Sequence, residues 1–207
     1  MKTTARLLRK LLCSCPWFYP PGNAPKNAKK VIYLTFDDGP HPIYSNIIMD
    51  ILADYGIKAT FFLLGSNIEK NLGTAQRMVD EGHVLGNHTY SHQILPKIGR
   101  AERIVEIEQC QNLIEKLQKQ PRLFRPPQGL MTITDTLYLL GLQYRPMLWT
   151  VDSKDHLFDD KIINRLENLP NRQNIVLFHD DNGACAEPLR YLLPLWVKQG
   201  ITFAVPC

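Results

Sequence analysis

The sequence predicts a parallel α/β fold, because short apolar runs alternate with longer segments of helical spacing from residue 31 to the end. Seven runs of the first kind are separated by six segments of the second kind. The 207 residues, 44% of them hydrophobic, suffice for one domain with a substantial core. The alternation fits an open doubly wound sheet and also a barrel one strand short of eight.

The first half of the chain contains three expected strands and three expected helices. VIYLT reads as a buried strand, YSNIIMDILADYG and NIEKNLGTAQRMVDEG have helical spacing and close at a glycine, and the longest helix stops before Pro121. In chain order we expect strand 31–35, helix 44–56, strand 58–64, helix 67–82, strand 83–87 and helix 100–118.

The same alternation continues to the carboxyl terminus. RLFR, QYRPMLWTV, NIVLFH and ITFAVP are short runs rich in apolar residues, and helical segments follow the first three. In chain order we expect strand 122–125, helix 132–141, strand 143–151, helix 159–168, strand 174–179, helix 187–199 and strand 201–206. No GxGxxG or GxxxxGK[ST] follows any of these strands, which removes the main support for a nucleotide site.

Unusual polar residues follow five of the expected strands directly. They are Asp37 and Asp38, His88 and His92, Arg125, Asp152 and Asp155, and His179 with Asp180. Sites in barrels and open parallel sheets are built at the carboxyl ends of the strands. We therefore expect these side chains to meet at one rim.

The pair His88 and His92 suggests a metal site. An H-x₃-H pair with a nearby carboxylate can supply a His₂Asp ligand set that leaves positions open for water. Taken alone the pair also fits a structural role, but its convergence with TFDDGP and LFHD favours the metal. Of the two adjacent aspartates, one would bind the cation and the other would take a proton from water. The competing interpretation of TFDDGP is two acids that cap a turn.

The segments TFDDGP, HTYSH, RPPQG, DSKDH and LFHD, in this order, resemble the five motifs of the polysaccharide deacetylase family. This NodB-homology family is also called carbohydrate esterase family four. The resemblance covers about residues 31–207, so we expect one catalytic domain there, preceded by a basic arm at 1–30. It implies a distorted TIM-like (β/α)7 barrel in a single domain.

The resemblance also implies a role for each matching residue. Asp37 would be the general base, positioned by Arg125, and His179 the general acid, tuned by Asp155. The metal ligands would be Asp38, His88 and His92, and the metal most often zinc, with cobalt, nickel or manganese as alternatives. Substrate-binding positions would be Pro127, Gln128, His156 and Leu177, of which Leu177 would line the pocket for the acetyl methyl group.

Two positions depart from the family pattern. Family members usually carry Tyr where this chain has Gln128, and Trp where it has His156. The backbone N–H of Gln128 could still stabilise an oxyanion. Loss of the aromatic at 156 removes a platform for a sugar ring, so the substrate need not be ordinary chitin or peptidoglycan.

Charge is distributed unevenly along the chain. Of 24 Lys and Arg residues seven lie in 1–30, which holds no acid, so 31–207 carries 17 basic against 20 acidic residues. The acidic body argues against nucleic-acid binding. The arm has a leucine face, at 7, 8, 11 and 12, that fits contact with an anionic membrane surface and equally a helix docked on the domain.

Location is predicted from the same features. The arm lacks an A-x-A cleavage site and basic residues interrupt its apolar run, which disfavours secretion. The five scattered cysteines form no disulfide pattern. We expect a cytoplasmic or membrane-peripheral protein of a bacterium.

The predicted function is metal-dependent removal of acetyl groups from N-acetylated amino sugars. An acetylated saccharide is the expected partner, and the sequence does not define the oligomeric state. Hydrolysis of O-acetyl esters or of non-sugar amides would use the same residues and is the first alternative. A carbohydrate-binding protein whose catalysis has decayed is the second.

Overall fold

The computed structural model describes residues 23–25, 28, 30–158, 161–170 and 173–206, and its framework is a parallel sheet of eight strands. The strands, in chain order, are β1 (Val31–Asp37), β2 (Thr60–Leu63), β3 (Val84–Asn87), β4 (Leu123–Phe124), β5 (Arg145–Pro146), β6 (Val151–Asp152), β7 (Gln173–His179) and β8 (Thr202–Phe203). Their order in the sheet is β5-β4-β3-β2-β1-β7-β6, and β8 pairs with the start of β1. Residues 1–22 of the basic arm, which include its leucine face, lie outside the described residues, so its predicted membrane contact stays a prediction.

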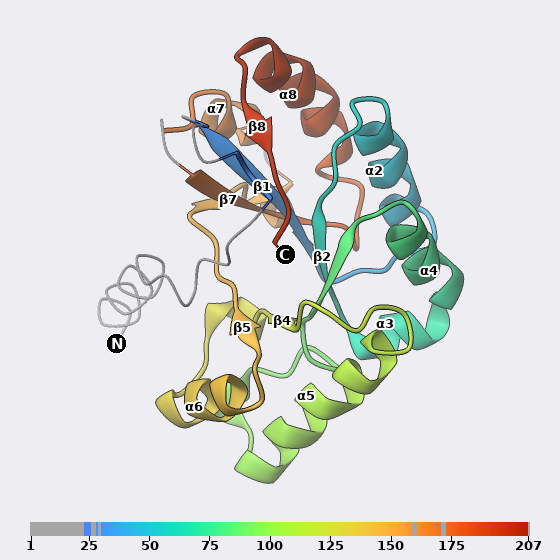
Figure 1. Ribbon diagram of the computed structural model, residues 1–207, viewed down its shortest axis with the longest axis vertical. Coiled ribbons are helices and arrows are strands. Elements are labelled where there is room, and N and C mark those ends of the chain that lie inside the picture. The colour runs from blue at the N-terminus through green and yellow to red at the C-terminus, as the bar shows by residue number, and fades with distance from the viewer. Residues whose placement is uncertain (1–22, 26–27, 29, 159–160, 171–172, 207) are drawn as a thin grey trace.

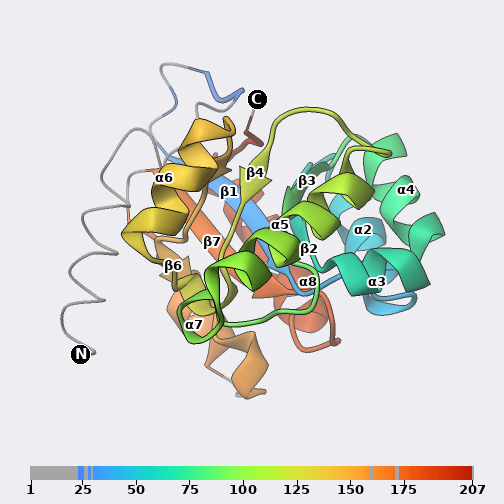
Figure 2. The same ribbon diagram turned by 90° about the horizontal axis from the view of Figure 1, so that it is seen from below.

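Helices cover the outside of this curled sheet (Figure 1, Figure 2). They are α2 (Tyr44–Ala53), α3 (Gly65–Lys70), α4 (Leu72–Asp80), α5 (Arg100–Ile114), α6 (Ile133–Gly141), α7 (Ile162–Leu166) and α8 (Ala186–Lys198). Short 3₁₀ turns occur at Leu95–Lys97, Pro127–Gly129 and Asp155–Leu157. No helix within the described ranges has the length and apolar character that a membrane crossing requires.

The sheet curls until its two edges are joined by the chain itself. The edge strands β5 and β6 are consecutive in sequence, and only residues 147–150 separate them. Five residue steps span at most about 18 Å, so the two edges must lie close to each other. This arrangement is a distorted (β/α)7 barrel in a single domain, as the resemblance implies.

Alternation along β1 divides the core into two clusters. Ile32, Leu34 and Phe36 belong to the large cluster shared with the helices, whereas Val31 and Tyr33 belong to a cluster with Phe62, Met147, Trp149 and Leu177 inside the barrel. Side chains two apart on a strand share a face. Asp37 therefore continues the inner face.

Two expected elements are wrong in their boundaries. The single helix 67–82 is two helices, because Asn71 leaves the helical backbone at φ −133° and ψ 44° and donates through its side chain to the carbonyl oxygen of Pro40 at 3.1 Å. The single strand 143–151 is the pair β5 and β6, whose halves pair with opposite neighbours, β4 and β7. The other expected strands and helices are present with shifted ends.

Candidate active site

A cleft of about 310 Å³ opens at the carboxyl ends of the strands. Eight of its lining residues were predicted for the site and carry the expected polar or apolar groups. The lining residues are Asp37, Asp38, His88, His92, Gln128, Trp149, Asp152, His156, Leu177, His179, Asp181 and Asn182. Chain segments far apart in sequence thus meet at one rim, as the positions after the strands predict.

The two adjacent aspartates enter the cleft by different means. Asp37 ends β1 and is 3% exposed, on the inner face of the strand. Asp38 leaves the strand in the left-handed region at φ 75°, which is uncommon for a residue other than glycine. Its carbonyl oxygen accepts a hydrogen bond from Nδ2 of Asn67 at 2.8 Å. The backbone turn after β1 therefore lets successive carboxylates converge on one space.

Position 39 must be a glycine because its backbone packs closely against the side chain of Asp180. A Cβ at position 39 would overlap the buried carboxyl of Asp180. This carboxyl accepts a hydrogen bond from Ser45, and burial raises the pKa of Asp180 to about 8. A neutral carboxyl group therefore supports the loop that carries Asp38.

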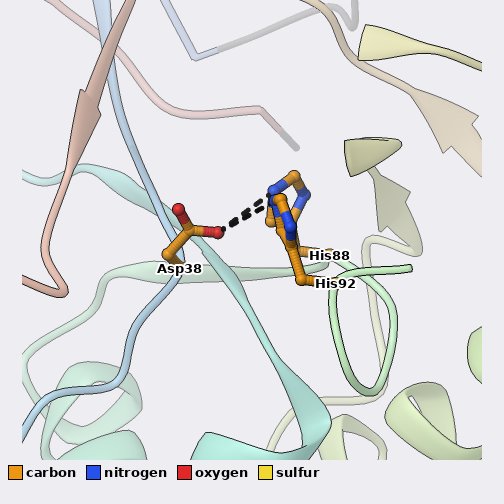
Figure 3. A group of neighbouring side chains, drawn as sticks. All are labelled: Asp38, His88 and His92. Atoms are coloured by element: carbon orange, nitrogen blue, oxygen red, sulfur yellow. Dashed lines mark ion pairs between the residues drawn. The ribbon is translucent and has the colours of Figure 1, made fainter. Parts of the chain in front are cut away.

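Asp38, His88 and His92 present their ligand atoms to a common point (Figure 3). Oδ1 of Asp38 lies 3.4 Å from Nε2 of His88 and 3.4 Å from Nε2 of His92. This Oδ1 is buried and has no hydrogen-bond partner among the described residues. A buried carboxylate oxygen without a partner is costly, and a cation held by all three groups would satisfy it. The residues fit a divalent metal with two imidazoles and one carboxylate.

His88 is held in the state that a metal ligand needs. Its Nδ1 donates to the carbonyl oxygen of Arg125 at 2.7 Å, which leaves Nε2 for the common point. Burial lowers the pKa of His88 below its usual value, although Asp37 and Asp38 oppose this shift. The imidazole is therefore neutral at pH 7 and can ligate through Nε2.

Arg125 fixes Asp37 from inside the barrel. Its guanidinium is fully buried and donates from Nη1 to Oδ1 of Asp37 at 2.7 Å and to the Thr35 hydroxyl at 2.8 Å. Nε donates to the carbonyl oxygen of Met147 at 2.9 Å, and the group lies 4.0 Å from the centre of the Phe62 ring. The two residues therefore form a buried ion pair that fixes the position of the Asp37 carboxylate.

His179 lies beside Asp37, because the two residues are partners in the register of β1 and β7. Its Nδ1 donates to Oδ1 of the buried Asp155 at 2.7 Å, and its backbone N–H donates to Oδ2 of the same carboxylate at 2.7 Å. Burial alone would lower the pKa of His179, but Asp155 outweighs burial and raises this pKa to about 9. Nε2 is left free of Asp155, and the imidazole is protonated at neutral pH.

The predicted substrate positions divide between the cleft and its wall. Gln128, His156 and Leu177 line the cleft, whereas Pro127 is buried in the turn below it. Gln128 adopts a left-handed backbone at φ 56°. The ring of His156 lies 5.4 Å from that of His179, edge to face. The structure thus places a polar ring where family members usually carry an aromatic platform.

Sequence reasoning missed several residues of the cleft, namely Trp149, Asp181 and Asn182. Trp149 was assigned to the interior of a single strand, where no signal separates a cleft residue from a core residue. Asp181 and Asn182 follow LFHD directly, so extending the rule of polar residues after strands by two positions would have found them.

Comparison with known proteins places the chain among deacetylases. A family model described as polysaccharide deacetylase matches residues 24–145. The peptidoglycan-N-acetylglucosamine deacetylase of Bacillus cereus is 34% identical over 206 residues, which cover 95% of this chain and 94% of that protein. The peptidoglycan-N-acetylmuramic acid deacetylase PdaC of Bacillus subtilis is 37% identical over 175 residues, covering 83% of this chain but 37% of that longer protein.

Solved structures agree in fold. Peptidoglycan deacetylase PdaC from Bacillus subtilis matches with a TM-score of 0.79 at 33% identity, over 87% of this chain and 89% of that chain. A family four pseudoenzyme from Bacillus anthracis matches with a TM-score of 0.78 at 27% identity, over 88% of this chain and 65% of that chain. The same fold therefore occurs in enzymes and in a protein described as a pseudoenzyme.

Proposed function

Because the chain belongs to the polysaccharide deacetylase family, we propose that it is a metal-dependent hydrolase that removes acetyl groups from N-acetylated amino sugars. The observation that carries this proposal is the contrast between its adjacent aspartates. Asp37 forms an ion pair with the buried Arg125. In contrast, Oδ1 of Asp38 lacks a hydrogen-bond partner among the described residues and faces two imidazole nitrogens. One carboxylate is thus prepared for proton transfer and the other for a cation.

The three proposed ligands would hold the Lewis acid of the reaction. Asp38, His88 and His92 would hold a divalent metal, zinc foremost, which would polarise the acetamide carbonyl and lower the pKa of water. Arg125 holds Asp37 in place, so that Asp37 can accept the proton of the attacking water. His179, held protonated by Asp155, donates a proton to the nitrogen as the C–N bond breaks. Acetate and a free amino sugar leave.

The substrate contacts follow from the cleft walls. Leu177 provides an apolar wall for the acetyl methyl group, and the Gln128 backbone N–H is the proposed donor to the oxyanion. His156 offers less apolar area to a sugar ring than Trp. We therefore expect weaker discrimination for sugars beyond the reacting residue than an aromatic platform would give.

The decisive experiment is acetate release from N-acetylated and O-acetylated saccharides, measured with and without a chelator. We expect release from chito-oligomers or peptidoglycan strands that stops with chelator and returns with added zinc or cobalt. Release from O-acetylated substrates alone would favour the esterase alternative. Sugar binding without any acetate release would favour a decayed, carbohydrate-binding function.

A further inference from the structure

The loop between the two ligand histidines has an unfavourable backbone. Thr89 and His92 both adopt positive φ angles, 71° and 63°, and neither is a glycine. Each such residue costs free energy and persists only where surrounding contacts determine it. The spacing of the two ligands therefore depends on groups outside the loop.

One side of the loop is held by backbone donors of α3. The N–H of Gly65 donates to the carbonyl oxygen of Thr89 at 3.0 Å, and the N–H of Ser66 donates to that of Tyr90 at 2.9 Å. On the opposite side the Asn87 side chain accepts from the N–H of Thr89 at 2.8 Å. These contacts fix the first half of the loop and leave Ser91 to a different partner.

That partner is Glu106 of α5, a carboxylate that is only 8% exposed. Its Oε2 accepts from the N–H of Ser91 at 2.8 Å, and its Oε1 accepts from the Ser91 hydroxyl at 2.7 Å. Hydrogen bonds to an ionised acceptor are roughly twice as strong as neutral ones, and a bidentate pair also fixes direction. Ser91 directly precedes His92, so this contact fixes the position of the backbone from which the His92 side chain extends.

We propose that Glu106 is a positioning residue for the metal site: through Ser91 it sets the separation of His88 and His92 and thereby the affinity for the cation. This inference rests on the proposed function, because it concerns the metal that the deacetylase would use. Groups behind a ligand commonly set metal affinity, and their loss costs about 10–100-fold. Both side-chain hydrogen bonds of Glu106 within the described part of the chain go to Ser91, so we assign it no part in proton transfer.

The substitution Glu106→Gln isolates this role, because it keeps the size of the side chain. Glutamine can still accept from the Ser91 N–H through its oxygen and donate to the Ser91 hydroxyl through its NH₂ group, so the variant removes the charge that strengthens both bonds. The matched control is Glu102→Gln on the same helix, where the Glu102 side chain is exposed and makes no hydrogen bond to the described residues. Both variants lose one negative charge, so a purely long-range charge effect would appear in both.

The test measures zinc affinity of the full chain by competition with a chromophoric chelator. We expect Glu106→Gln to bind zinc about 10–100-fold more weakly, and Glu102→Gln to bind it like the wild type. Acetate release by Glu106→Gln should recover at high zinc, and its circular dichroism without zinc should match that of the wild type. Equal zinc affinity in Glu106→Gln and wild type would overturn the proposal.

Hydrogen exchange of the metal-free proteins provides an independent measurement. We expect faster exchange at the amides of residues 88–92 in Glu106→Gln, with no change in the amides of β2. Unchanged exchange in the loop would overturn the proposal, whether or not the wild type binds zinc. If zinc binds as expected but no substrate releases acetate, the proposed function fails while the role of Glu106 stands.

Discussion

The strongest prediction concerns the adjacent aspartates, because their replacement by asparagine should fail in two different ways. In Asp37→Asn the ligands Asp38, His88 and His92 stay in place, so zinc should remain bound. Loss of the general base should lower kcat by about 10²–10⁴-fold, and added metal should not restore it. In Asp38→Asn the metal affinity should fall, and excess zinc should recover part of the rate.

The structure also gives a stability cost for Asp37→Asn. The variant leaves the buried Arg125 without its carboxylate, and removing one partner of a buried pair typically costs about 3–5 kcal/mol. Asparagine can still accept from Nη1, and the Thr35 hydroxyl keeps its bond to the same nitrogen. We therefore expect the lower end, about 3 kcal/mol, in the free energy of unfolding. Asp38 has no such cation behind it, so Asp38→Asn should cost less.

The assay combines zinc content, urea unfolding and acetate release across a zinc titration, on both variants and the wild type. Refolded protein of each variant must show the wild-type circular dichroism before its rates are compared. If Asp37→Asn loses zinc while Asp38→Asn keeps it, the two roles are reversed. If both variants keep zinc and full activity, TFDDGP is only a turn at the end of a strand.

Three further predictions test the surroundings of the site. Arg125→Met should leave Asp37 buried without its partner cation and lower kcat/KM while zinc affinity stays at the wild-type level; an unchanged kcat/KM would contradict the pairing. Activity should fall as pH rises through about 9, where His179 loses its proton, and Asp155→Asn should move this limb to lower pH. The pair of protonated His179 with Asp155 contributes its full stability below the ordinary imidazole pKa of 6.5. This contribution is lost as the pH rises through about 9, which thermal unfolding measured against pH will show. His156→Trp should lower KM for chito-oligomers more than it changes kcat, because stacking is largely uniform binding; reduced activity would instead indicate a specific role for His156.

Much of the fold follows from local patterns. The long strands β1 and β7 are near-continuous apolar runs. This pattern is typical of parallel strands that are buried on both faces of the sheet. The helices α2 and α8 have apolar residues at helical spacing and a glycine shortly after their ends, which are local signals. Their order along the chain limits the topology further, because parallel strands need crossover connections.

The site could be predicted because its groups follow a simple rule of position. Asp37 and His179 end strands, and Asp38 and His88 follow strands directly, so the topology alone brings them to one rim. The contacts that orient them are different in kind. No sequence spacing connects Ser91 with Glu106, since the pair depends on how α5 lies against the loop, and this follows only from tertiary packing.

The wrongly predicted strand at 143–151 shows why local patterns fail at the barrel seam. As one strand, its central residues would give their carbonyl groups to a neighbouring strand. Instead the carbonyl oxygen of Met147 accepts from Arg125 at 2.9 Å, and that of Leu148 lies 3.5 Å from the same guanidinium. These acceptors help to satisfy a buried cation that would otherwise be costly. The broken strand that joins the two edges of the sheet thus also holds Arg125 against Asp37, so closure of the barrel and the position of the proposed base depend on the same segment, residues 147–150.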